Sequence, residues 1–293
     1  MAGFVDLHIH SHFSGDGEFS PRELFEMAAR SDLCAFSISD HDTLAAADQG
    51  LLLAKEFEIE FVPNVEISTE YQDRSYHVLA PLIDPHDREL DDLLAAQQLA
   101  RVEQARGRVA RLQELGFDIT YDEVERSTGE ATPVGPAIAE LLLQKQSSRS
   151  DSRLQPYLTG EKSRGRAIHF YRDFFRRGCP AYAEARDTDL LKALQVIRES
   201  GGVPVLAHPG AKGFSADEAA IEFFTQAGME GLEVYSSYHS PQDTQRFAEI
   251  ADRFGLVASA GSDFHGRVKP HVAFGSVRFR GRDLLEELKR RCN

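Results

Sequence analysis

The stretch of sequence that decides the fold is DLHIHSHFSGDGE, which runs from Asp6 to Glu18. Apolar and polar residues alternate from Val5 to His10, which is typical of a β-strand. Residues two apart in a strand share a face, so His8 and His10 are expected side by side at roughly 6.6 Å. Two such imidazoles can turn toward one metal ion, although an isolated pair is often only a polar strand surface. Residues elsewhere in the chain decide between these interpretations.

Further short apolar segments recur along the chain, with helical stretches between them. Strands are predicted at 34–42, 60–68, 76–83, 201–210, 231–237 and 255–265. The alternation of strand and helix predicts an α/β fold with a largely parallel sheet. Seven strands with polar residues gathered at their C-terminal ends favour a TIM-like barrel that lacks one unit.

The middle of the chain has a different pattern. From residue 87 to residue 183 no strand is predicted, and a long amphipathic helix begins the segment. We therefore expect residues 1–86 and 184–293 to form a barrel domain, and residues 87–183 to form a helical insertion or lid.

Composition narrows the classes of function. The 293 residues carry a net charge of −14, which argues against a general nucleic-acid or membrane binder. The three cysteines are far apart, which disfavours a disulfide framework and a cysteine-based zinc site. No run of eighteen apolar residues occurs, and the N-terminus lacks a leader pattern, so we expect a cytoplasmic protein.

Histidines and carboxylates recur at the predicted strand ends, where barrel enzymes carry their active sites. The candidate metal ligands are His8, His10, Asp16, His41, Glu66, His77, His208, Asp263 and His265. Individually, His41 also suits a helix cap, Glu66 a solvated strand end and His208 a turn before proline. Taken together, imidazole and carboxylate ligands favour zinc, manganese or iron over calcium.

The motifs DLHIHSHFSGDG, ISDHDT, NVEIS, YHVLA, LAHPG and GSDFHG resemble, in order, those of the polymerase and histidinol phosphatase (PHP) family. The resemblance implies a distorted (β/α)7 barrel that hydrolyses phosphate esters by attack of a metal-activated hydroxide. It also implies a centre of two or three divalent metal ions (Mn, Zn or Fe). By resemblance, one metal is held by His8, His10, Glu66 and Asp263. A second is held by Glu66, His77 and His208, and a third by Asp16, His41 and His265.

The insertion between YHVLA and LAHPG resembles a PHP subgroup that dephosphorylates nucleoside 3′,5′-bisphosphates and trims RNA from the 5′ end. That likeness implies catalytic roles for Asp263 and for His239, with His239 donating a proton or binding phosphate. A loop histidine at a helix start is the alternative for His239. The chain departs from this subgroup at two places. Members commonly carry Arg-Pro-His where this chain has Gly135, Pro136 and Ala137. In addition, Asp16 lies one residue further from His10 than in close relatives.

The insertion is also locally basic. Residues 145–177 contain nine lysines and arginines against three acidic residues. A phosphate clamp that includes Arg164 and Arg166, with Tyr171 or a nearby phenylalanine stacked on a base, is one interpretation. A solvated helical face is the other.

The leading hypothesis is therefore a phosphoesterase that acts on a small nucleotide or an oligonucleotide 5′ end, with no membrane and no stable protein partner. The alternatives are a sugar- or histidinol-phosphate phosphatase and a non-catalytic PHP binding module. A deaminase or other amidohydrolase also uses two histidines on a first strand, but the DHD, HPG and SDFH motifs fit that class poorly.

Overall fold

The computed structural model describes residues 3–184, 187–279 and 281–292. Its strands are β1 (Phe4–Asp6), β2 (Leu33–Phe36), β3 (Glu60–Phe61), β4 (Glu66–Tyr71), β5 (Arg74–Leu79), β6 (Thr188–Asp189), β7 (Val205–Leu206), β8 (Gly231–Ser236) and β9 (Val257–Gly261). The first helices are α1 (Pro21–Ala29), α2 (Ala47–Phe57), α3 (Arg88–Glu114), α4 (Tyr121–Thr128), α5 (Gly135–Gln144) and α6 (Gln155–Leu158). They are followed by α7 (Arg166–Phe174), α8 (Leu190–Glu199), α9 (Glu218–Gln226), α10 (Pro241–Phe254) and α11 (Arg282–Arg291). Short 3-10 turns cover His12–Ser14, Ser147–Ser150 and Gly266–Val268.

The strands form two sheets, and the α/β class predicted from the sequence is confirmed. A parallel three-stranded sheet has the order β1-β2-β3, and a six-stranded sheet has the order β6-β4-β5-β7-β8-β9. Isolated bridges join Ile9 to Phe264 and His41 to Glu66, and thus connect the two sheets. The six-stranded sheet is mixed, because β5 runs antiparallel to both of its neighbours.

Two strand predictions needed correction for a local reason. The segment 60–68, expected as one strand, is divided into β3 and β4 around Pro63, so Glu66 begins a strand and does not end one. The antiparallel pairing of β4 with β5 follows from a two-residue turn at Gln72 and Asp73, which have φ angles of 50° and 59°. Turns with two positive φ angles match the twist of a hairpin.

The predicted helix starts are well supported by capping. Ser20 and Glu23 form a reciprocal capping box at the start of α1, with Pro21 at the first helical position. Asp87 caps α3 by accepting a hydrogen bond from the backbone N–H of Leu90 at 2.9 Å. The long helix expected at the start of the insertion is thus present as the 27 residues of α3.

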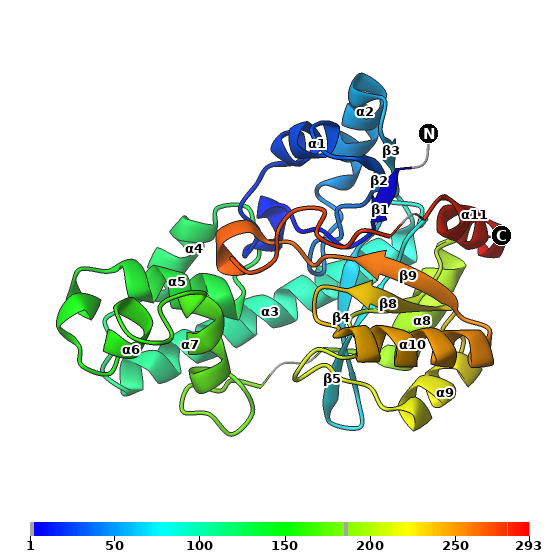
Figure 1. The fold of residues 1–293 in the computed structure, drawn as a ribbon. Helices are drawn as coiled ribbons and strands as arrows, with labels where there is room; N and C mark the ends of the chain where they lie inside the picture. Colours follow the sequence, from blue (N-terminus) through cyan, green and yellow to red (C-terminus); the bar gives the residue numbers. More distant parts are fainter. Residues whose placement is uncertain (1–2, 185–186, 280, 293) are drawn as a thin grey trace.

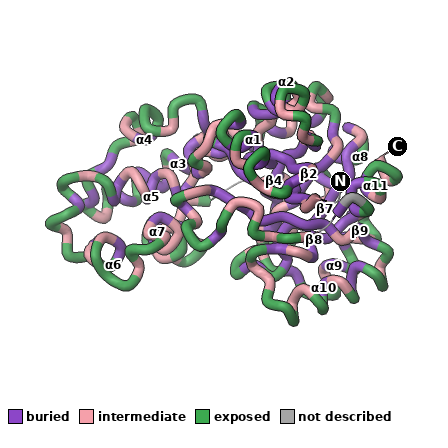
Figure 2. The backbone as a smooth tube through the Cα atoms, turned by 45° about the horizontal axis from the view of Figure 1, so that its top comes forward, coloured by how far each residue is buried: buried purple, intermediate pink, exposed green. Residues whose placement is uncertain are grey.

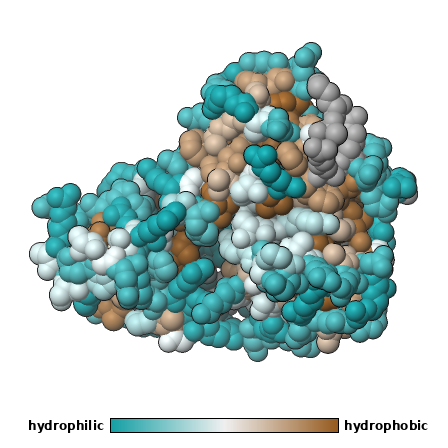
Figure 3. Space-filling view, viewed as in Figure 1, coloured by the Kyte–Doolittle hydropathy of each residue, from teal (hydrophilic) through white to brown (hydrophobic). Residues whose placement is uncertain are grey.

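Helix α3 runs from the sheets to the other helices of the insertion (Figure 1). It contributes residues to two hydrophobic clusters. Its Leu90 and Leu94 belong to a cluster with residues of β4, β5, α8, α9 and α10. Its Val109 and Leu112 belong to a cluster with residues of α4, α5 and α7. Helices α4 to α7 form a lobe beside the sheets, in which buried segments alternate with exposed ones (Figure 2). The outer surface of that lobe is largely hydrophilic, and the molecule is indented between the lobe and the sheets (Figure 3). In the described part of the chain, no helix is long and apolar enough to cross a membrane.

Candidate metal centre

The structure brings all nine predicted ligands together from distant parts of the chain. Seven of the nine are buried, and His41 and His77 have side chains exposed by 15% and 12%. Eight of the nine lie on a strand or within five residues after one, and Asp16 lies in the loop after the His12–Ser14 turn. Gly17 permits this loop, because a Cβ atom there would lie 2.0 Å from the carbonyl oxygen of Ser11. The longer spacing between His10 and Asp16 therefore does not keep Asp16 away from the cluster.

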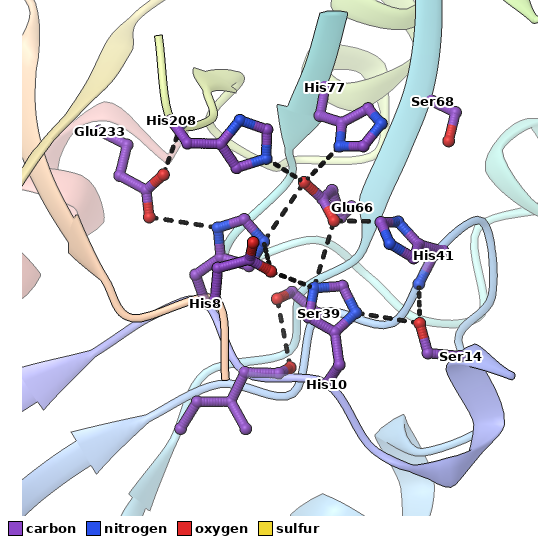
Figure 4. Close-up of polar contacts among 12 residues, drawn as sticks. His8, His10, Ser14, Ser39, His41, Glu66, Ser68, His77, His208 and Glu233 are labelled. Carbon is purple, nitrogen blue, oxygen red and sulfur yellow. Dashed lines mark hydrogen bonds and ion pairs between the residues drawn. The ribbon is translucent and has the colours of Figure 1, made fainter. Parts of the chain in front are cut away.

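Glu66 lies at the centre of the cluster (Figure 4). Its Oε1 lies 2.8 Å from His77 Nδ1 and 3.0 Å from His208 Nε2. Its Oε2 lies 2.9 Å from His41 Nδ1 and 3.2 Å from His10 Nε2. Burial alone would raise the pKa of Glu66, but His77, His8 and His41 hold it well below its usual range. The carboxylate is therefore ionised and faces imidazoles on both of its oxygens.

Asp263 is the second carboxylate shared by several histidines. Its Oδ1 lies 3.1 Å from His10 Nε2 and 3.4 Å from His8 Nε2. Its Oδ2 accepts a 2.6 Å hydrogen bond from the Tyr238 hydroxyl and pairs with Lys269 Nζ. One oxygen is thus held by the protein, which leaves the other directed at the histidines.

The hydrogen bonding of the buried ligand atoms gives separate support for bound metal ions. Three groups of side chains place one ligand atom each within 4.8 Å of one another. They are His8, His10, Glu66 and Asp263; His10, Asp16, His41 and His265; and His41, Glu66 and His77. Eight of the nine predicted ligands carry a buried nitrogen or oxygen without a hydrogen-bond partner. Buried polar atoms are nearly always satisfied, so convergent unsatisfied ligand atoms point to ions between them.

Two supporting residues escaped the sequence analysis. Glu233 on β8 is fully buried, and its Oε1 lies 3.1 Å from His8 Nδ1 while its Oε2 accepts from the backbone N–H of His208 at 2.5 Å. Lys269 is mostly buried, and although burial opposes its charge, Asp263 raises its pKa above the usual value. A buried glutamate inside the apolar strand GLEVYSS is a signal that could have identified Glu233.

A pocket of about 460 Å³ opens beside the cluster, between the sheets and the helical lobe. Its lining includes the predicted ligands Asp16, His41, His77, His208 and Asp263. The lining also contains eight basic side chains and five acidic ones. The basic residues are Arg74, Arg101, Arg108, Arg172, Arg176, Arg177, Lys212 and Lys269. Tyr171, expected to stack on a base, is part of the lining as well.

Three predicted substrate-side residues lie elsewhere. Arg166 forms an ion pair with Glu140 at 2.5 Å, and neither Arg164 nor Arg166 is part of the pocket lining. His239 also lies outside the lining: its Nδ1 donates to the carbonyl of Val234 at 2.8 Å, and its Nε2 accepts from the N–H of Gly210 at 3.1 Å. Both ring nitrogens are therefore occupied by backbone groups, and the expected proton donation by His239 has no geometric support.

Comparison with known proteins agrees with this chemistry. The chain is 30% identical to a 3′,5′-nucleoside bisphosphate phosphatase from Chromobacterium violaceum, over 89% of this chain and 87% of that protein. It is 31% identical to a phosphoribosyl 1,2-cyclic phosphate 1,2-diphosphodiesterase from Eggerthella lenta, over 92% of this chain and 97% of the relative. A crystal structure described as a putative metal-dependent phosphoesterase from Bifidobacterium adolescentis superposes with a TM-score of 0.84 at 26% identity, covering 100% of this chain and 98% of that one.

These relatives and the buried histidine–carboxylate cluster define a metal-dependent hydrolase of phosphoester bonds. The PHP domain family matches residues 6–157, which is more than half of the sequence. The chain belongs to the PHP family, as its motifs predicted.

Proposed function

We propose that this phosphoesterase acts on a nucleotide or on the 5′ end of an oligonucleotide. The observation that carries the proposal is the pocket, whose lining joins candidate metal ligands to the arginines and Tyr171 of the helical lobe. Guanidinium groups suit phosphate, and an aromatic ring suits a base. The net charge of −14 makes this local excess of positive charge more informative, because the rest of the surface would repel a polyanion.

The nine predicted ligands would hold two or three divalent ions, for which manganese, zinc and iron suit the mixture of imidazole and carboxylate. Such ions would supply an activated water molecule and positive charge for the phosphoryl oxygens. Other residues of the chain hold the ligand side chains in place. Glu233 holds the ring of His8, and Tyr238 and Lys269 hold one oxygen of Asp263.

The architecture supports two further proposals. Hydrogen bonds from Leu7 N–H to Ala260 O and from Asp42 N–H to Glu66 O link the two sheets, which supports a distorted (β/α)7 barrel. The separate hydrophobic cluster of the helices supports residues 87–183 as a lid over residues 1–86 and 184–293. The three cysteines are free, which suits a reducing compartment such as the cytoplasm.

A second candidate is a phosphodiesterase of a cyclic sugar phosphate, favoured by the 31% identity to the Eggerthella lenta relative. Both candidate functions use the same metal centre, and they differ in the part of the substrate that the helical lobe contacts. A cyclic sugar phosphate has no base, so it makes no use of an aromatic side chain at Tyr171.

The test is hydrolysis of a substrate panel with manganese, zinc or iron supplied. The panel contains AMP, adenosine 3′,5′-bisphosphate, a short 5′-phosphorylated RNA, histidinol phosphate and phosphoribosyl 1,2-cyclic phosphate. We expect the highest kcat/KM for a nucleotide or RNA end, and at least a threefold rise in KM for it in Tyr171→Ala. A higher kcat/KM for the cyclic sugar phosphate, unaffected by Tyr171→Ala, would establish the second candidate instead.

A further inference from the structure

Arg101 on α3 connects the helical insertion to two other parts of the chain. Its side chain is 17% exposed, and its Nε lies 3.2 Å from Oδ2 of Asp42 while its Nη2 lies 3.2 Å from Oδ1 of Asp187. Its Nη1 donates to Oε1 of Gln104 at 3.3 Å. Asp42 directly follows the candidate ligand His41, and Asp187 directly precedes β6. All three nitrogens of the guanidinium therefore face protein acceptors, although Arg101 also lines the pocket.

Two glutamines that precede Arg101 on α3 extend this junction. Gln98 donates from Nε2 to the backbone carbonyl of Asp42 at 3.0 Å. Gln97 is 2% exposed, and its Oε1 accepts from the N–H and from the hydroxyl of Thr188 in β6, at 3.0 Å each. Glutamine is rarely buried, and a buried amide needs such hydrogen bonds. Helix α3 is therefore fastened by directed polar contacts to β6 and to residues 40–42, which we call the His41 loop.

Asp42 transmits this connection to His41. Its φ angle of 54° lies in the left-handed region, which costs energy for a residue other than glycine. Its N–H donates to the carbonyl of Glu66 at 3.0 Å, its Oδ1 accepts from the N–H of Ser68 at 2.8 Å, and its Oδ2 accepts from Arg101. In this conformation the neighbouring His41 places its Nδ1 2.9 Å from Oε2 of Glu66 (Figure 4). The direction of His41 into the metal centre thus depends in part on a residue of the insertion.

We propose that Arg101 is a positioning residue of the metal centre, which keeps His41 in place by fastening the His41 loop to the insertion. The inference rests on the function proposed above, and it gives the insertion a role in metal binding. His41 belongs to two of the three groups of convergent ligand atoms. The group without it consists of His8, His10, Glu66 and Asp263. Loss of the Arg101 contact should therefore weaken the binding of some metal ions and spare at least one.

The first test is a manganese titration of chelator-treated Arg101→Lys by calorimetry. Lysine keeps a positive charge beside the two aspartates, so the protein should fold, but its single nitrogen lacks the fork that joins them. We expect at least one manganese ion to bind about 10-fold or more weakly than in the wild type, and at least one other to bind within about twofold. Arg111→Met is the matched control, because Arg111 lies on α3, has a 58% exposed side chain and is not part of the pocket lining. An equal loss at every site, no loss at any site, or the same loss in the control would overturn the proposal.

Asp42→Asn tests the same link from its other end. The amide oxygen can still accept from Ser68, but the negative charge opposite Arg101 is lost. This variant should weaken the same manganese ion. The double variant with Arg101→Lys should bind that ion within about threefold of the weaker single variant, because both changes break one link. Fully additive losses would contradict the proposal.

Kinetics distinguish positioning from substrate contact. At saturating manganese, kcat and KM of Arg101→Lys should return to within about threefold of the wild type, because the ligand His41 is itself unchanged. A raised KM that manganese does not correct would make Arg101 a substrate contact and refute the positioning role.

Nitrogen-15 spectra of the metal-free protein separate this role from the proposed activity. The ring signals of His41 should change in Arg101→Lys and in Asp42→Asn but not in Arg111→Met, while those of His8 stay as in the wild type. Unchanged His41 signals in the first two variants would overturn the proposal, whether or not metal binds. If the wild type hydrolyses no phosphoester but the His41 signals change as expected, the proposed function fails and the positioning role stands.

Discussion

Replacing Glu233 by glutamine tests how the protein prepares His8 for a metal ion. The carboxylate accepts at both oxygens, from His8 Nδ1 at 3.1 Å and from the backbone N–H of His208 at 2.5 Å. Because a carboxylate only accepts, Nδ1 of His8 carries the proton and Nε2 keeps its lone pair for an ion. Nε2 is also the atom of His8 without a hydrogen-bond partner.

In Glu233→Gln the backbone N–H of His208 still requires an acceptor, so the amide oxygen turns toward it. The amide NH₂ then faces His8 Nδ1 and favours the tautomer with the proton on Nε2, which cannot bind metal. We expect metal affinity to fall roughly 10- to 100-fold, the usual range for such supporting residues.

The assay is a manganese titration of chelator-treated protein by calorimetry, with kcat/KM measured across the same metal concentrations. At saturating metal, kcat should return to within a few-fold of the wild type, because Glu233 contacts a ligand residue and not the substrate pocket. Nitrogen-15 spectra of His8 should report the change of tautomer directly. Glu222→Gln on the exposed face of α9 is the control. Unchanged manganese affinity, or an equal loss in the control, would refute the reasoning.

Three other predictions concern the same centre. Tyr238→Phe removes the 2.6 Å hydrogen bond to Asp263. It should lower kcat/KM about 10-fold, as expected for the loss of a hydrogen bond to a charged group. Equal steady-state rates in the variant and the wild type would show that Asp263 does not need this hydrogen bond. Gly261→Ala would place a Cβ atom 2.2 Å from Cβ of His8. Urea unfolding should therefore show a loss of roughly 1–3 kcal/mol in the free energy of unfolding, and metal should bind more weakly. Metal binding equal to that of the wild type would contradict this steric conflict. Chelation should lower the Tm by several degrees, and manganese should restore it. The reason is that a ligand at 100 times its Kd stabilises the folded state by about 2.7 kcal/mol per site. A Tm that does not change with metal would argue against bound ions.

The sequence by itself determined the class of fold and the set of candidate ligands. The alternation of apolar and polar residues through His8 and His10 and the repetition of histidine or carboxylate near later strands depend only on local periodicity, which a sequence displays directly. The strand itself was predicted too long, because β1 ends at Asp6 and both histidines follow it. The motif order then indicated the PHP family and phosphoester hydrolysis. The long helix α3 was equally predictable, because its apolar positions recur with helical spacing over many turns.

Only the tertiary structure decided which side chains support the ligands and which face the substrate pocket. Glu233, Tyr238 and Lys269 act through contacts made across 6 to 225 residues of sequence, and no local period reports such pairs. Arg164 and Arg166 matched the expected charge but are not part of the pocket lining, and Arg166 pairs with Glu140 instead. Arg108 is the converse case. It looks like any surface arginine in a polar helix, and its burial beside Gly135 appears only when α3, α5 and α7 pack together.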